Sequence, residues 1–472
     1  MSELHTLRSG QWPTSYHGSR TPRREKARSH DPTAAARSYL RLLVKLVGAY
    51  PIIWALGAGG FFIILAAIPS AAYLLRARLT PLARAAVGIP IVLVCCIPIG
   101  VLSFGFDVNR VISVAGNVSV WLVLAAGLDA ASKAPIRDQL ARALVWVGIA
   151  QGGLTFIASM IYPARLPLPI IAQYADALPS GPASFARSDL FFRGWLNGET
   201  FRSEGMMSNA TWAGAFGALA LIVAISQFRR GERRWFYALG AATAAVSVYY
   251  SLSRSSWLLL AGALGVAAYY VARRNNAMFA VAFANITLAL TIAAYVLTGQ
   301  DIFAEFDEIN EGRSGSAISR GAIYSTTLGY IRELMVPLIG YGIKPKEEGL
   351  VASVATHSTY LGLTFRAGLI GLVLLLAIVV RLIAQVRAAH NALGAGVLAF
   401  VAGWMILADI DAGHLVPLFL LLCVTYAPPE DDSGGPPGDG GPVGAEELLP
   451  QPRAGRRERI RADVPVGRAR RR

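Results

Sequence analysis

Apolar runs about twenty residues long recur along most of this 472-residue sequence, and short polar connectors separate them. A helix of about 20 apolar residues crosses a hydrocarbon core about 30 Å thick, and runs such as 277–298 and 360–380 reach that length. Hydrophobic residues make up 54% of the chain and charged residues only 15%, which excludes an ordinary soluble domain. Because a helix satisfies its own backbone polar groups in lipid, the sequence predicts an all-α polytopic membrane protein.

The apolar runs predict ten spans after residue 84. They lie near 85–102, 111–128, 141–162, 208–226, 235–252, 256–272, 277–298, 360–380, 394–410 and 413–427. The first apolar block, 46–75, is long for one span and short for two. We interpret it as a hairpin of two short helices that turns at residues 57–60, because a single tilted span would put the basic N-terminus outside. We therefore expect about 11–12 transmembrane helices.

The net charge of +15 predicts an orientation in the membrane, not nucleic-acid binding. Lysine and arginine gather in the tails and in every second connector, as the positive-inside rule requires of cytoplasmic segments. The basic connectors are 76–84, 133–142, 229–234, 273–276 and 381–390. The two long connectors, about 163–207 and 299–359, are therefore expected on the outer face of the membrane.

Composition divides the chain into a tail at 1–37, a transmembrane domain at 38–427 and a second tail at 428–472. Both tails are polar and rich in Arg, Pro or Gly, so we expect them to be disordered and cytoplasmic. The second tail ends with nine arginines after Pro452. Its charge favours loose contact with anionic lipid; the simpler reading is a solvated tail with no specific partner.

The three cysteines, Cys95, Cys96 and Cys423, lie in apolar runs without the spacing of a disulfide framework or a metal site. The outer connectors also lack a carboxylate cluster suited to a divalent cation. The sequence predicts neither a cofactor nor a bound metal.

Basic residues in the outer connectors are the candidates for chemistry. Arg202 precedes a span of small residues, and Arg254 lies at the tight junction of two spans. In the loop 299–359, apolar residues at helical spacing predict a helix along the bilayer surface over 316–338, which carries Arg320 and Arg332. His357 lies where the chain enters the next span. Fixed positive charge and one imidazole on the same membrane face suit chemistry on a phosphate-bearing lipid.

Each candidate also has a simpler reading when taken alone. Arg202 is placed like an arginine that extends its head to lipid headgroups at a span end. Arg254 is placed to form a salt bridge with Glu199, Glu204 or another outer carboxylate. A lone histidine such as His357 is more often an interfacial anchor than a catalyst.

The order of these pieces resembles the O-antigen ligase and Wzy-type polymerase superfamily, over about residues 200–375. The residues that carry the resemblance are Arg202 with Gly205 and Asn209, the Ser253-Arg254 pair, Arg320 followed by Tyr324, Gly340-x-Gly342, and His357-x-x-Tyr360-Leu361 with Gly368 and Gly371.

The resemblance implies a bacterial membrane glycosyltransferase of the GT-C type. Such enzymes transfer a glycan from undecaprenyl diphosphate to an acceptor sugar hydroxyl at the outer face of the plasma membrane, without a cofactor. It further implies that His357 is the base and that Arg202 and Arg320, with Arg254, hold the donor diphosphate. An imidazole with an ordinary pKa of about 6.5 suits proton abstraction, and guanidinium groups bind phosphate oxygens in pairs. A flippase or chain-length regulator would be a natural partner.

Three positions depart from the family pattern. The family often has Asn directly after the histidine, where this chain has Ser358. The family also often has a Pro near the Asn that follows the first arginine, where this chain has Ala210. Arg366-Ala367 replaces an acidic residue that is common before the following glycine.

The sequence leaves three readings open. The resemblance does not separate a polymerase, which extends one lipid-linked repeat with another, from a ligase, which moves the finished polymer to a different acceptor. A transporter or flippase for an anionic lipid-linked substrate is the alternative from another class, although the halves of the chain show no internal repeat. A receptor or scaffold without chemistry is the third reading.

Overall fold

The computed structural model describes residues 32–134, 137–162, 169–170, 174, 177, 201–207, 209–229, 233–274, 314–333, 338–345, 350, 353–388 and 392–410. All of them belong to the first of two compact units, Met1–Glu430. The second unit, Asp431–Arg472, lies outside the described residues, as do the predicted spans at 277–298 and 413–427.

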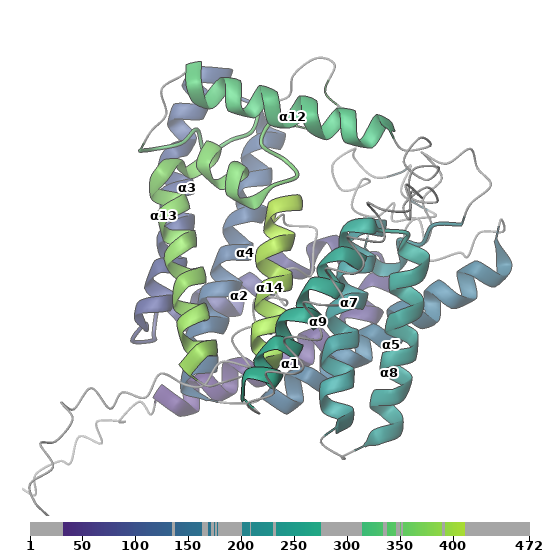
Figure 1. Ribbon diagram of the computed structural model, residues 1–472. Coiled ribbons are helices and arrows are strands. Elements are labelled where there is room, and N and C mark those ends of the chain that lie inside the picture. The colour runs from purple at the N-terminus through teal and green to yellow at the C-terminus, as the bar shows by residue number, and fades with distance from the viewer. Residues whose placement is uncertain are drawn as a thin grey trace, which may run out of the picture. The chain divides into compact units, whose positions relative to one another are not determined.

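Helices are the regular elements of the described residues (Figure 1). They are α1 (Pro32–Ala55), α2 (Phe62–Leu74), α3 (Pro81–Phe104), α4 (Val108–Lys133), α5 (Arg137–Ile161), α7 (Ala210–Arg229), α8 (Arg234–Ser251), α9 (Arg254–Arg274), α12 (Ser314–Glu333), α13 (Thr359–Ala388) and α14 (Ala392–Leu407). Short 3₁₀ turns lie at Gly59–Phe61 and Gly205–Met207. The all-α prediction is confirmed.

Six helices in the described part are long and apolar enough to cross a membrane: Pro81–Phe104, Val108–Lys133, Asp138–Ile161, Ala210–Phe228, Arg254–Ala272 and Thr359–Ala388. Each overlaps a predicted span, although Thr359–Ala388 continues eight residues beyond the predicted end at 380. Two shorter apolar helices, Gly59–Leu74 and Ala392–Leu407, accompany them. The chain is a multi-pass membrane protein.

The first apolar block forms a helical hairpin, as expected. Tyr39, near the start of α1, stacks on Tyr73, near the end of α2, with ring centroids 4.9 Å apart. Closer to the turn, Tyr50 meets Phe62 edge to face. The two helices therefore run antiparallel. α1 begins at Pro32, so the helix includes residues that we had assigned to the tail ending at 37, because an apolar face with Ala36 and Tyr39 is buried.

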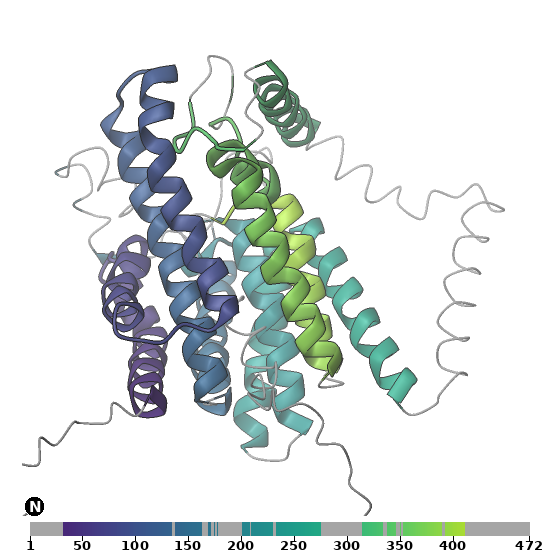
Figure 2. The same ribbon diagram turned by 90° about the vertical axis from the view of Figure 1, so that its left-hand side faces the viewer.

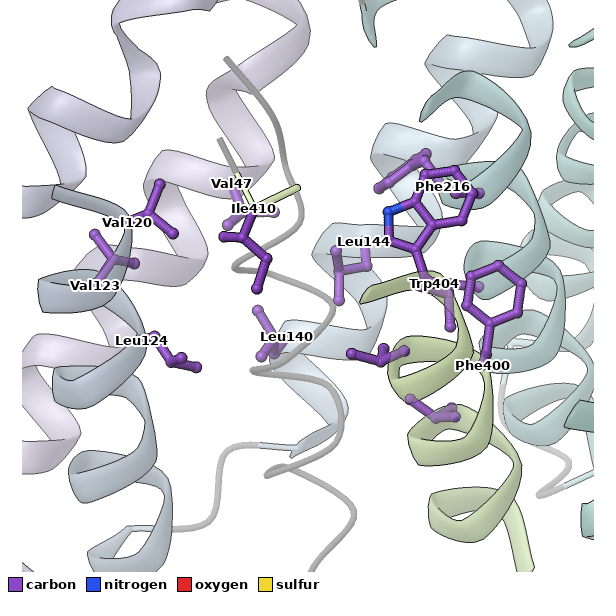
Figure 3. Packing of buried hydrophobic residues seen from close by; sticks show 14 of the residues in the cluster. Val47, Val120, Val123, Leu124, Leu140, Leu144, Phe216, Phe400, Trp404 and Ile410 are labelled. Atoms are coloured by element: carbon purple, nitrogen blue, oxygen red, sulfur yellow. The ribbon is translucent and has the colours of Figure 1, made fainter. Parts of the chain in front are cut away.

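Contacts link ten of the described helices in a closed order: α1, α2, α4, α3, α13, α14, α9, α7, α8, α5 and again α1. One cluster of buried apolar side chains extends through them. Figure 3 shows part of it, with Phe216 of α7 beside Phe400 and Trp404 of α14. α7 is rich in alanine and glycine, so neighbouring backbones approach it closely.

One end of these helices carries the candidate residues. The junction of α8 and α9 lies there, and so does the start of α13, whose Thr359 N–H donates to the carbonyl of Ala408 after α14. Figures 1 and 2 show α12 running across this end, nearly perpendicular to the long helices, as expected of a surface helix. The ends of α2, α4, α7 and α13, from which the basic connectors continue, lie at the opposite end.

Candidate functional site

The backbone of His357 lies in an uncommon conformation. Its φ is 67°, and φ of the nearby Ala355 is 60°. Residues with a Cβ rarely occupy this left-handed region, at a cost of roughly 1 kcal/mol each. Such a conformation persists only where surrounding contacts enforce it, and these contacts are found on both sides of His357.

α12 holds the loop from one side. The Tyr324 hydroxyl donates to the carbonyl oxygen of His357 at 2.8 Å, and the Ala355 N–H donates to the Thr327 hydroxyl at 2.8 Å. Thr327 and Ala355 are buried. Arg320 precedes Tyr324 by four residues, so its position lies one turn earlier on the same face of α12; its side chain is outside the description.

α13 and α14 hold the loop from the other side. Ser358 is the residue before α13, and its hydroxyl accepts the Leu361 N–H at 3.4 Å. Thr359 donates through both its N–H and its hydroxyl to the carbonyl of Ala408, and its hydroxyl accepts the N–H of Ile410. The loop is therefore fixed to the end of α14 directly after His357.

A kink in α13 and the segment 338–342 fit together beside this loop. Gly368 has φ 65°, which interrupts the helix and frees carbonyls in the preceding turn. The N–H groups of Tyr341 and Gly342 donate to two of these carbonyls, on Phe365 and Arg366, at 3.0 and 2.8 Å. Two glycines in Gly340-Tyr341-Gly342 would by themselves favour a flexible turn, but the segment is hydrogen-bonded to α13 and Tyr341 is buried.

Arg202 lies at the α8–α9 junction. Its Nε donates to the carbonyl of Ser251 at 3.0 Å, and the N–H of the next residue, Ser203, donates to the carbonyl of Tyr250 at 2.9 Å. The buried side chain of Gln151 supports this segment from α5, since its Oε1 accepts the Met206 N–H at 2.7 Å. The buried amide of Gln151 thus fixes the backbone that follows Arg202 against α5.

Arg254 begins α9 at the same junction. The hydroxyl of Ser253 accepts the Ser256 N–H at 3.4 Å and so caps the helix before Arg254. Arg254 is partly exposed, and within the described part of the chain it has no ion-pair partner within 4.0 Å. Glu199, one of the carboxylates that we considered for it, lies outside the described residues.

α7 and α14 connect the Arg202 and Arg254 junction to the His357 loop. The Ser256 hydroxyl of α9 donates to the carbonyl of Thr211 at 3.3 Å, and Trp212 of α7 meets Trp404 of α14 with centroids 5.3 Å apart. One turn beyond Trp404, the carbonyl of Ala408, directly after α14, accepts the hydrogen bond from Thr359. The structure places Arg202, Arg254 and His357 at one end of the helices, together with the helix that carries Arg320.

A buried group of charges was not among the candidates from the sequence. Arg366 of α13 is 3% exposed, and its Nη2 lies 3.1 and 3.3 Å from the two carboxylate oxygens of Asp409. Lys344 also forms an ion pair with Asp409. Arg110, at the start of α4, donates to the Lys344 carbonyl and to the Ser353 hydroxyl. The available signal was Asp409 at the end of an apolar run, followed two residues later by Asp411, since a charge within or next to a span requires a partner.

The three departures from the family pattern have local explanations here. Ser358 caps α13, a position at which Ser and Asn are equally favoured. Ala210 is the first residue of α7 after the cap Asn209, and Pro is favoured at that position. Arg366 has its own counter-charge in Asp409.

The described residues contain no group of three or more His, Cys, Asp and Glu side chains close enough to hold a metal ion. The polar side chains at this end of the helices include guanidinium, ammonium, hydroxyl and imidazole groups, which bind anions and hydroxylated ligands, together with the carboxylates of Asp107 and Asp409.

Residues 239–376 match the family model described as O-Antigen ligase. The matched range runs from α8 into α13 and contains Arg254, Arg320 and His357, whereas Arg202 precedes it. No curated protein matches the chain. The match supports the resemblance inferred from the residues, over the matched part of the chain.

Proposed function

We propose that this protein is a membrane glycosyltransferase that moves a glycan from undecaprenyl diphosphate to an acceptor sugar hydroxyl on the outer face of the bacterial plasma membrane. The family match supports a ligase or polymerase type of activity. The observation that carries the proposal is the His357 loop, held in a left-handed conformation by α12 on one side and α14 on the other.

In the proposed reaction, His357 accepts the proton of the acceptor hydroxyl as its oxygen attacks the anomeric carbon of the donor sugar. The bond between that carbon and the phosphate oxygen breaks, and the diphosphate leaves with the electron pair. Arg202, Arg254 and Arg320 bind the diphosphate and offset its developing charge. Guanidinium groups in this role replace the divalent cation on which many glycosyltransferases depend.

The distribution of charge supports the orientation. The basic connectors lie at the end of the helices opposite to His357, and the positive-inside rule assigns that end to the cytoplasm. The donor lipid would then reach the arginines from the outer leaflet, and α12 would lie along the outer surface.

The test uses His357→Asn and His357→Gly in a strain that lacks the chromosomal gene. Both residues tolerate a positive φ, so they remove the imidazole without adding backbone strain. We expect each to lower transfer by about 10²–10⁴-fold, the usual contribution of a general base. The measurement is the amount of polyprenyl-diphosphate-linked glycan that accumulates, compared with the wild-type gene.

Ala355→Gly is the matched control, because it changes the other left-handed residue of the loop and keeps the imidazole. It should retain most of the transfer. Normal turnover in His357→Asn would remove His357 from the mechanism. The chemical identity of the accumulated glycan also separates the two family activities, since single repeats indicate a lost polymerase and long polymer indicates a lost ligase.

A further inference from the structure

α4 contacts the segment that leads to the His357 loop, although α4 precedes the matched residues 239–376. Arg110, in the first turn of α4, donates through its Nη1 to the carbonyl of Lys344. The same nitrogen donates to the hydroxyl of Ser353 at 2.9 Å. These two acceptors stand at the beginning and the end of the segment 344–353, so one guanidinium nitrogen bridges its two ends.

Hydrogen bonds within the loop continue from these ends toward His357. The N–H of Val354 donates to the carbonyl of Pro345 at 3.1 Å, next to the two oxygens that the guanidinium binds. The Thr356 hydroxyl then donates to the carbonyl of Ser353 at 2.7 Å. The contact with α4 is therefore connected through Ser353 and Thr356 to the residue directly before His357.

Asp107 fixes the orientation of the Arg110 guanidinium. Its Oδ2 lies 3.3 Å from Arg110 Nε, and its Oδ1 accepts the N–H of Asn109 at 2.9 Å, which caps α4. Nε thus binds the first turn of α4 while Nη1 binds the loop. The Arg110 side chain is 18% exposed, so water competes little for these bonds.

We infer that Arg110 is a positioning residue for transfer, which acts through Ser353 and Thr356 on His357. It holds the His357 backbone in the left-handed conformation that sets the direction of the imidazole. The role of that imidazole as a base rests on the proposed function. A strained backbone persists only where its surroundings enforce it, so the loss of one support lets the loop relax. A small displacement of a reacting group is enough to slow the reaction strongly.

The test measures transfer by the purified full-length protein in detergent. The polyprenyl-diphosphate-linked glycan and the acceptor are extracted from the strain that lacks the gene, where neither is consumed. Arg110→Met keeps an apolar stem and removes every donor. We expect it to lower kcat by about 10–100-fold, the effect of a misplaced reacting group. KM for the lipid-linked glycan should change less than about twofold, because the lost bonds are within the protein.

Arg110→Lys tests whether hydrogen bonding is the property that matters. Both bonds to the loop leave from Nη1, so one ammonium nitrogen can make them, and this variant should recover most of kcat. A role in packing alone would give the Lys and Met variants the same kcat. The matched control is Arg142→Met, since Arg142 is also partly exposed and lies near the start of α5, which follows the far end of α4. It should transfer like the wild type.

A double-mutant cycle tests whether Arg110 acts through the loop. Ser353→Ala removes one of the two acceptors and keeps the carbonyl that binds Thr356, so it should lower kcat less than Arg110→Met. The double variant should be no slower than Arg110→Met alone, because the shared bond is already lost. Hydrogen exchange gives a readout without any transfer reaction. The peptide that contains Val354 should exchange faster in Arg110→Met and be unchanged in Arg142→Met.

Three results would overturn the inference. A raised KM with an unchanged kcat would assign Arg110 to direct contact with a ligand, in the cavity of about 420 Å³ that it lines together with Thr356. Losses that multiply in the double variant would show that Arg110 acts independently of Ser353. An unchanged kcat in Arg110→Met would show that α12 and α14 hold the loop without α4.

His357→Asn separates this inference from the proposed reaction. If His357→Asn abolishes transfer but Arg110→Met keeps its kcat, only the role of Arg110 fails. If His357→Asn transfers normally, the proposed reaction fails. Faster exchange at Val354 in Arg110→Met would in that case still show that Arg110 holds this loop.

Discussion

At the scale of single residues, this protein uses buried polar groups mainly to fix backbone. Tyr324 and Thr327 bind the loop around His357, and Gln151 supports the segment that carries Arg202. Thr327 and Gln151 are fully buried, so water cannot replace a lost partner and their bonds are costly to remove. The backbone that carries His357 and Arg202 is therefore held in place by neighbouring side chains.

Asp409 pairs with both Arg366 and Lys344, so its substitution should lower the stability of the protein more than that of either partner. Asp409→Asn would leave the buried Arg366 without the carboxylate that it pairs with, and we expect it to lower the free energy of unfolding by about 3–5 kcal/mol. Arg366→Leu should cost less, because the Lys344–Asp409 pair remains. Thermal unfolding in detergent would measure both variants.

Asp107→Asn is the control for Asp409→Asn. Its carboxylate is 49% exposed and pairs with Arg110 at 3.3 Å, so water compensates for the lost charge and the expected cost is below about 1 kcal/mol. If Asp409→Asn lowers the free energy of unfolding as little as Asp107→Asn does, the buried pair of Arg366 and Asp409 does not stabilise the protein.

At the scale of elements, the kink in α13 joins two parts of the site. It frees the carbonyls that bind Tyr341 and Gly342, and the N–H of Ile370 donates back to the carbonyl of Leu338. The kink requires a glycine at position 368, because the backbone has a positive φ and there is no room for a Cβ. A Cβ on Gly368 would lie 2.3 Å from the Leu338 oxygen, in a residue whose φ is already 65°.

Gly368→Ala should therefore lower the free energy of unfolding by about 2–5 kcal/mol, since strain and a backbone clash act together. Gly329→Ala on α12 is the matched control, because a Cβ there meets nothing within 4 Å and the residue lies inside a helix. It should be neutral or stabilising by about 0.5–1 kcal/mol. Equal stability of the two variants, compared by thermal unfolding, would contradict the assigned role of the kink.

At the scale of the whole molecule, the two ends of the helices differ in chemistry. One end carries the basic connectors, and the other carries α12, the His357 loop, Arg202 and Arg254. A polar site at a helix-bundle end is reached both by a lipid-linked donor and by a water-soluble glycan, which a site in the bilayer centre would exclude.

The assigned orientation can be measured by cysteine labelling in a variant whose own three cysteines are replaced. Ser325→Cys on the exposed face of α12 should react with a membrane-impermeant maleimide in intact spheroplasts. Arg84→Cys, exposed at the basic end, should react only after permeabilisation. The opposite pattern would place the His357 loop in the cytoplasm and contradict the proposed reaction.

The sequence by itself determined the helices, the hairpin of α1 and α2, and the candidates Arg202, Arg254, Arg320 and His357. Apolar length, helical periodicity and charge bias are properties of short segments, so they can be interpreted without knowing what packs against them. The same reasoning placed a surface helix before His357, and α12 lies there.

Only the tertiary structure decided how these segments meet. Arg366 pairs with Asp409 across 43 positions, and Arg110 reaches the Lys344 carbonyl across 234. The left-handed backbone of His357 and the bonding of Gly342 to α13 likewise depend on partners from other helices. Hydrogen bonds and ion pairs between distant segments form only where packing brings donor and acceptor within about 3 Å, and no local pattern encodes that approach.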